Sequence, residues 1–151
     1  MITIICVGKI KEKYLTDAIK EYSKRISKYS KLNIIEVSDI DEGSISEVID
    51  KEGNDILKYI KDRDYVITME IEGNRLSSVE LARKIDTVFN NYSNIVFVIG
   101  GSYGLSDSIK SRSNYALSFS NLTFPHQLFR VMLLEQIYRV FKINNNETYH
   151  K

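Results

Sequence analysis

The 151-residue sequence has few residues of the kinds that build covalent or metal-bound frameworks: it holds one cysteine and two histidines. Cys6 has no partner for a disulfide or a thiolate metal site, and it lies in an apolar run, so we expect a small buried core residue. His126 and His150 have no second Cys or His at ligand spacing, whereas a closed zinc site needs a full tetrahedral set of ligands. The sequence therefore predicts no metal site.

Long apolar segments and nucleotide fingerprints are also missing. No window approaches the roughly 20 apolar residues of a membrane span, and no basic segment precedes a long apolar run at the N-terminus, so we expect a soluble, cytoplasmic protein. The first strand is followed by the single glycine Gly8, which disfavours a nicotinamide-dependent oxidoreductase. The absence of a Walker A sequence and of a Gly-x-Ser-x-Gly elbow argues against nucleotide hydrolysis by that route and against an esterase.

The charge is small in total and uneven in distribution. The net charge is +1, but residues 110–151 hold six basic and two acidic residues, so the preceding residues are net acidic. This asymmetry favours an anionic partner near the C-terminal end.

Apolar periodicity predicts one α/β domain with a mostly parallel sheet, because strands alternate with helices along the chain. A chain of this length can build a single core. We expect strands at residues 2–7, 32–37, 65–71, 95–99 and 115–119, the third ending in a turn at residues 72–74. We expect helices at residues 15–29, 45–60 (interrupted near Gly53), 77–91 (with a capping box from Ser77 to Glu80), 106–112 and 125–143.

The last predicted helix has an unusually wide apolar face. Its apolar residues span an arc of roughly 200°, whereas covering a single core needs a stripe of only about 100°. The surplus suggests packing on the sheet and also on a second subunit. Arg130 falls inside this arc, so we expect it to have an acidic or carbonyl partner and a structural role rather than direct substrate contact.

Two segments suggest chemistry. Residues 100–104 form a glycine-rich turn after a buried strand, which suits the approach of a nucleotide but equally suits a tight turn with nothing bound. The tail ends in Tyr149, His150 and Lys151, the side chains for stacking an unpaired base, moving a proton and pairing with phosphate. Polar C-terminal residues are otherwise usually disordered.

Four segments together resemble the ribosomal RNA large subunit methyltransferase H family, which belongs to the SPOUT class. They are FVIGGSYGL at residues 97–105, ALSFSNLTFPHQLFRV at 116–131, EQIYR at 135–139 and YHK at 149–151. The resemblance extends from Ile4 to the last residue. It implies a single SPOUT-type α/β domain over residues 1–151, with a mostly parallel sheet flanked by helices and a C-terminal trefoil knot. It also implies a homodimer.

The resemblance implies S-adenosyl-L-methionine as methyl donor, with no metal. In the family the donor is held largely by backbone groups of three loops, and glycines allow its close approach. The matching positions are Met69, Gly100, Gly101, Gly104, Phe119, Ser120, Asn121, Leu122, Thr123 and Phe124.

The implied reaction is methylation at N3 of a pseudouridine in a stem-loop of 23S rRNA near the decoding centre. The partner is this rRNA in the large subunit or in the assembled ribosome, and no membrane is involved. Our catalytic candidates are Arg139 to hold phosphate or the base, Tyr149 to stack or position it, and His150 as general base. We expect the tail to serve the partner subunit's donor. Two alternatives stay open: a SPOUT methyltransferase acting on another rRNA or tRNA site, and a non-catalytic ribosome-binding module.

Overall fold

The computed structural model describes all 151 residues, and its five strands form one sheet in which every pairing is parallel. The strand order is β2-β1-β4-β3-β5. The strands are β1 (Ile2–Val7), β2 (Leu32–Val37), β3 (Tyr65–Arg75), β4 (Ile95–Ile99) and β5 (Tyr115–Ser118). The α/β fold with a parallel sheet is confirmed.

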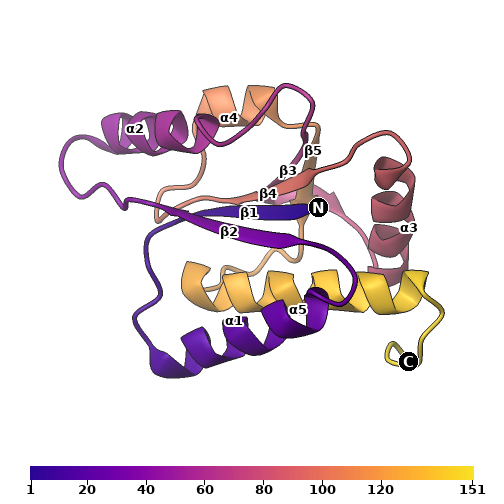
Figure 1. Cartoon of the computed structure of the whole chain (residues 1–151). Helices are drawn as coiled ribbons and strands as arrows, with labels where there is room; N and C mark the ends of the chain where they lie inside the picture. The colour runs from indigo at the N-terminus through magenta and orange to yellow at the C-terminus, as the bar shows by residue number, and fades with distance from the viewer.

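Helices cover both faces of the sheet (Figure 1). Helices α1, α3 and α5 lie on one face, and α2 and α4 lie on the other. Their bounds are α1 (Lys13–Ile26), α2 (Ile45–Leu57), α3 (Ser78–Phe89), α4 (Asp107–Arg112) and α5 (His126–Asn144). The capping box predicted at Ser77 and Glu80 opens α3. None of these helices combines the length and the apolarity that a crossing of the membrane would require.

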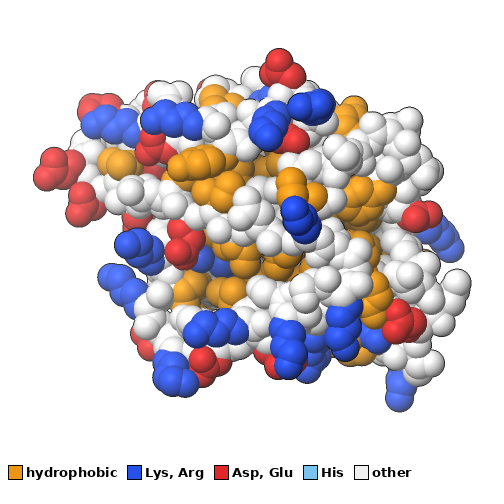
Figure 2. Space-filling model, viewed as in Figure 1, with side chains coloured by type: hydrophobic (Ala, Val, Ile, Leu, Met, Phe, Trp, Pro, Cys, Tyr) orange, Lys and Arg blue, Asp and Glu red, His pale blue; other side chains and the backbone are white.

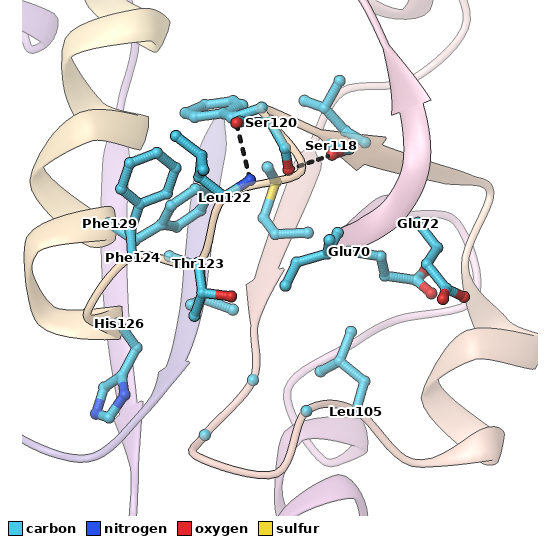
Figure 3. A pocket seen from close by; sticks show the side chains of 18 of the residues that line it. Glu70, Glu72, Leu105, Ser118, Ser120, Leu122, Thr123, Phe124, His126 and Phe129 are labelled. Atoms are coloured by element: carbon cyan, nitrogen blue, oxygen red, sulfur yellow. Dashed lines mark hydrogen bonds between the residues drawn. The ribbon is translucent and has the colours of Figure 1, made fainter.

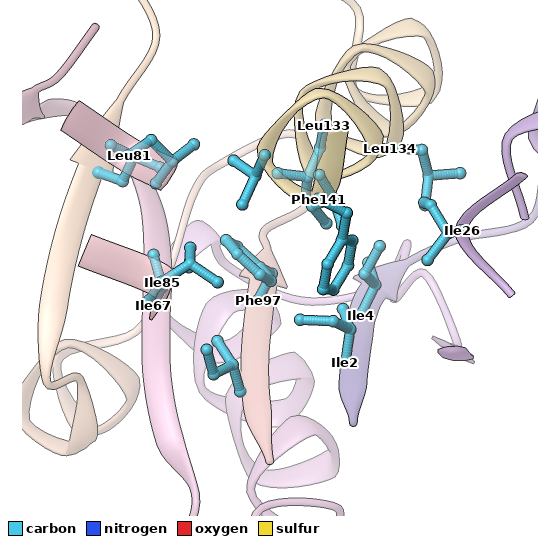
Figure 4. Packing of buried hydrophobic residues seen from close by; sticks show 14 of the residues in the cluster. Ile2, Ile4, Ile26, Ile67, Leu81, Ile85, Phe97, Leu133, Leu134 and Phe141 are labelled. Atoms are coloured by element: carbon cyan, nitrogen blue, oxygen red, sulfur yellow. The ribbon is translucent and has the colours of Figure 1, made fainter. Parts of the chain in front are cut away.

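The core is divided by the sheet, as the alternation of side chains along each strand requires. In β4, Phe97 points to the larger cluster under α1, α3 and α5, while Val96 and Val98 point to the smaller cluster under α2 and α4. Figure 4 shows Phe97 facing Phe141 of α5 within the larger cluster. Cys6 belongs to this cluster and is 1% exposed, and burial raises the pKa of its thiol to about 12. The prediction of a core cysteine is confirmed.

Strand β3 is longer than its sequence pattern indicates. The predicted turn at residues 72–74 is wrong, because the strand continues to Arg75 after an irregularity. Met69 and Asn74 both align with Leu117 of β5, so the residues between them bulge out of the ladder. The Asn74 side-chain amide donates to the Ala116 carbonyl oxygen at 3.1 Å, which anchors the returning strand. The bulge brings its two glutamates to the carboxyl end of the sheet.

Helix α2 runs without the interruption predicted near Gly53. Gly53 is buried, and a Cβ there would lie 2.9 Å from Cβ of Ser106, the N-cap residue of α4. The glycine therefore lets α4 pack closely on α2 and does not break the helix.

Helix α5 packs between α1 and α3, which explains much of its wide apolar face. Tyr138 contacts Tyr22 of α1, and the Asn144 amide donates to the Ala82 carbonyl of α3 at 3.0 Å. Two neighbours in the same chain thus account for an arc that suggested a second subunit. The homodimer and the trefoil knot stay predictions.

Candidate functional site

A pocket of about 540 Å³ lies at the carboxyl edge of the sheet, and we call it the edge pocket. Met69 of β3, Ile99 of β4 and Leu117 of β5 line its base, and the loops that follow these strands form its walls. Ligands of open parallel sheets bind at this edge, and the volume is that of a typical small-molecule site.

The glycine-rich turn after β4 forms one wall of the edge pocket. A Cβ on Gly100 would lie 2.8 Å from the Gly104 carbonyl oxygen, and one on Gly101 would lie 3.0 Å from Oε1 of Glu52. These two glycines therefore permit contacts within the protein. Gly104 has a φ of +88° and open space around it, so it is the glycine that leaves room for close approach to the backbone.

The loop between β5 and α5 forms the opposite wall. Ser118 Oγ donates to the Ser120 carbonyl at 3.1 Å, and Ser120 Oγ accepts from the Leu122 amide at 3.0 Å, so the loop is held by its own hydrogen bonds. The rings of Phe119 and Phe129 lie 4.9 Å apart. These contacts give the pocket a wall of ordered backbone and aromatic faces.

Nearly all residues predicted to hold the donor line the edge pocket. They are Met69, Gly100, Gly101, Gly104, Phe119, Ser120, Leu122, Thr123 and Phe124. The exception is Asn121, which is exposed and does not line it.

Four titratable residues of the pocket were missed by the sequence reasoning: Glu70, Glu72, Lys110 and His126. Figure 3 shows the two glutamates together on the side opposite the phenylalanines. Glu70 accepts a hydrogen bond of 2.6 Å from Thr68 Oγ1. Their place in β3 just beyond its buried residues was a usable signal, since carboxyl ends of parallel strands meet at the ligand edge. His126 begins α5, and a helix start beside a glycine turn is a second such signal.

The three predicted catalytic residues form a separate group with Glu135, which we call the tail cluster. Arg139 Nε donates to Glu135 Oε1 at 2.8 Å, and the guanidinium lies 4.7 Å from the centre of the Tyr149 ring. The Tyr149 hydroxyl donates to Glu135 Oε2 at 3.2 Å. Burial, followed by the nearby Glu135 carboxylate, raises the pKa of Tyr149, so its phenol stays protonated. The tail is thus fixed on α5 by specific contacts.

His150 enters the tail cluster through Arg139, whose Nη1 lies 3.2 Å from Nδ1 of the imidazole. A guanidinium only donates hydrogen bonds, so Nδ1 is the acceptor. The neutral ring then carries its proton on Nε2, and its one free lone pair is engaged by Arg139. In this arrangement His150 accepts a substrate proton only after the Arg139 contact opens.

The edge pocket lies at the N-terminal end of α5, whereas the tail cluster lies toward its C-terminal end. His126 lines the pocket at the start of the helix, and Arg139 follows thirteen residues later. With a helical rise of 1.5 Å per residue, this places them about 20 Å apart. A second cavity of about 460 Å³ lies between them, lined by Phe119 and Phe124 toward the pocket and by Glu135 toward the cluster.

Arg130 is buried in the first half of α5, with 2% exposure. Its Nη1 donates to Glu36 Oε2 at 2.5 Å, and its Nη2 donates to the Gly8 carbonyl at 3.1 Å. The expected acidic or carbonyl partner is confirmed, and both kinds are present. These bonds tie α5 to the ends of β1 and β2, close behind the loop that forms the pocket wall.

Comparisons with known proteins place the chain in a family. A family model described as "Predicted SPOUT methyltransferase" matches residues 1–150. A protein of Clostridium botulinum named "Ribosomal RNA large subunit methyltransferase H" is 58% identical to the chain, and the match covers 99% of each. A protein of Methanococcus vannielii named "Putative ribosomal RNA large subunit methyltransferase H" is 57% identical over the same shares.

One solved structure shares the fold. It is a probable methylase family protein from Haemophilus influenzae, with a TM-score of 0.55 and 14% identity, and the match covers 99% of this chain and 70% of that one. The match of the family model over nearly the whole chain and the close relatives agree with the edge pocket at the carboxyl ends of the strands. The chain belongs to the SPOUT methyltransferase family.

Proposed function

We propose that this protein uses S-adenosylmethionine to methylate N3 of a pseudouridine in a 23S rRNA stem-loop near the decoding centre, as a homodimer with shared active sites. The observation that carries the proposal is the edge pocket, whose glycine turn and ordered loop supply backbone groups and aromatic faces for a nucleoside-like ligand. The names of the relatives that match over nearly their full length support large-subunit rRNA as the substrate.

The chemistry of the pocket fits this donor. The phenylalanine rings offer flat apolar contact to an adenine, and Gly104 leaves the backbone accessible. Glu70 and Glu72 place carboxylates where a cationic ligand gains favourable Coulomb energy. When bound, S-adenosylmethionine supplies an already activated methyl group. Met69, Gly100 and residues 119–124 would hold it through their backbone groups.

The acceptor atom lies on the Watson–Crick edge of the base, so the nucleotide must be unpaired or flipped before it reaches the pocket. Arg139 and Tyr149 would hold the RNA phosphate and the base. If Arg139 binds an RNA phosphate, its hydrogen bond to His150 is broken. Nδ1 of His150 is then free to accept the N3 proton. Binding of the correct RNA would thereby prepare the base for proton removal.

Sharing between subunits follows from the distance along α5. Methyl transfer needs reacting atoms about 3–3.5 Å apart, whereas Arg139 lies about 20 Å along α5 from His126 and about 15 Å from Phe129, both of which line the edge pocket of the same chain. The tail of a partner would close this gap. Large exposed apolar side chains occur on the segments that line the pocket: Leu122 lines it, and Tyr103 and Leu128 are chain neighbours of lining residues, at 69%, 55% and 39% exposure. Exposed apolar side chains on the segments of one site are consistent with a surface that a partner covers.

The direct test is transfer of a tritiated methyl group to purified ribosomes, followed by mass spectrometry of the digested rRNA. We expect one methylated pseudouridine per ribosome in 23S rRNA. Label on another nucleoside or on tRNA, or no label with intact 70S particles, would contradict the proposal. Calorimetric titration with S-adenosylmethionine separates the remaining alternative, because a non-catalytic binding module would bind no donor.

A further inference from the structure

Helix α1 and its flanking residues carry the strongest local charge of the molecule. Residues 9–31 hold eight basic and three acidic residues, whereas residues 32–109 hold seven basic and fifteen acidic ones. The basic excess near the C-terminal end therefore has a counterpart in this earlier segment. Figure 2 shows Lys and Arg side chains along the lower edge of the molecule, over α1, with fewer acidic ones between them.

Four of these residues form a row that we call the lysine face: Lys20, Lys24, Lys28 and Lys31. Their spacings of four, four and three residues place the first members on one side of α1 and continue the row past its end. All four are exposed, and none forms a salt bridge. Other basic residues of α1 are paired within the helix, Lys13 with Asp17 at 2.6 Å and Arg25 with Glu21 at 2.7 Å.

A solvated helix face usually mixes both signs, because like charges four residues apart repel each other. The row itself holds only lysines, and the carboxylates that neighbour it, Asp17 and Glu21, are each paired with another cation, Lys13 and Arg25. The charge of the lysine face is therefore available to an external anion. It is a poor self-association surface, since a symmetric contact between two copies would set lysines against lysines.

The lysine face leads to the tail cluster. Tyr29, between Lys28 and Lys31, donates to Glu147 Oε1 at 2.8 Å, which joins the end of the row to the tail. The Arg25 guanidinium lies 5.6 Å from the centre of the Tyr138 ring, and Tyr138 packs edge-on against Tyr149 at 4.9 Å. Aromatic rings interleaved with cations beside a basic row are the features by which a protein surface follows a nucleic acid strand.

We propose that the lysine face binds the phosphate backbone of the RNA that flanks the nucleotide held by the tail cluster. This inference rests on the proposed function, and it adds a second contact region on α1 to the site at the tail. RNA is favoured over an anionic membrane because the row is continuous with aromatic side chains that suit bases. The face orients the strand, and it makes no contact with the edge pocket.

The test compares two triple variants in the full-length protein. One is Lys20→Gln with Lys24→Gln and Lys28→Gln. The matched control is Lys51→Gln with Lys58→Gln and Lys61→Gln, which removes three exposed lysines from α2 and the segment after it, on the other side of the sheet. Ribosome binding is measured at several salt concentrations between about 50 and 200 mM, with methyl transfer and S-adenosylmethionine affinity measured alongside.

For the lysine-face variant we expect about tenfold weaker ribosome binding and a salt slope lower by about 2 to 3, because each lost phosphate contact lowers it by about 1. KM for ribosomes should rise in step, while kcat and donor affinity stay within about twofold of wild type. The control variant should change each quantity by less than about twofold.

Equal losses in both variants, or an unchanged lysine-face variant, would overturn the inference. Comparable binding of the wild type to phosphatidylserine vesicles, lost in the same variant, would assign the face to membranes. Failure of the proposed function would look different, since the wild type itself would then transfer no methyl group to ribosomes.

Discussion

Mixing two inactive variants tests the shared active site most directly. One variant, Gly104→Val, disables the edge pocket: φ at this position is +88°, so a branched side chain is strained by about 1–2 kcal/mol and enters the space left for the donor. The other lacks residues 149–151 and so loses two of the three catalytic candidates. Each variant alone should be inactive, because every site of its dimer lacks one of the two parts.

The expected recovery follows from shared sites, since Arg139 of the tail cluster lies about 20 Å along α5 from His126 of the edge pocket in the same chain. If each site combines the pocket of one subunit with the tail of the other, a mixed dimer has one intact site. Random exchange of equal amounts gives mixed dimers about half of the time, so about one quarter of wild-type activity should return. Methyl transfer to ribosomes measures it after the subunits have exchanged in dilute denaturant.

Recovery near zero, with subunit exchange shown by native mass spectrometry, would refute the reasoning. It would mean that pocket and tail act within one chain, which requires the tail to leave Glu135 and travel the length of α5. Wild type mixed with either variant should keep about half of its activity with or without exchange, so this mixture controls for inhibition by the variants.

Three further predictions concern stability. Glu36→Ala leaves the buried Arg130 with only a carbonyl partner, so urea titration should show the free energy of unfolding lowered by about 3 kcal/mol. A decrease below about 1 kcal/mol would mean that solvent replaces the carboxylate. Burial, then the charge of a nearby aspartate, raises the pKa of Glu52 in the folded protein. The protonated carboxyl therefore stabilises the fold fully below about pH 4.5, and this stabilisation is lost as the pH rises through the raised pKa. Glu52→Gln should therefore melt above wild type at pH 7 and no longer do so at pH 4, and a constant difference across this range would contradict the assignment. Gly53→Ala separates helix propensity from packing. Propensity alone predicts that the free energy of unfolding rises by about 1 kcal/mol, whereas the 2.9 Å approach of the new Cβ to Ser106 predicts a decrease of about 1–3 kcal/mol. A higher melting temperature would refute the packing argument.

Most of the fold could be predicted because local patterns and tertiary packing agree in this chain. Strands β1 and β4 match mainly apolar runs that each end at a glycine, and β2 matches a segment in which polar Asn33 and Glu36 lie among apolar residues. The exceptions have tertiary causes. The sequence marks Gly53 as a helix breaker, but its role is to make room for Ser106, which is distant in sequence. The turn predicted at residues 72–74 does not form, because Asn74 pairs again with β5.

The candidate site was predictable in part for a similar reason. The glycine turn and the loop after β5 are marked by continuous motifs, and they meet at one pocket. Glu70 and Glu72 were missed because a solvated strand end has the same pattern. The sequence indicated that Arg130 has an acidic or carbonyl partner, but it could not identify Glu36, which lies 94 residues away in the chain.

The strand order has a consequence for how the protein is made. β1 pairs with β2 on one edge and with β4 on the other, so the ribosome must synthesise about sixty more residues after β2 before the second pairing is possible. At about 5–20 residues per second, the nascent chain leaves that edge of β1 open for several seconds. Parallel pairings of such long range also form slowly. The walls of the edge pocket come from Met69 to Phe129, so the pocket is complete only near the end of translation, and a product that ends before Phe129 lacks part of its wall.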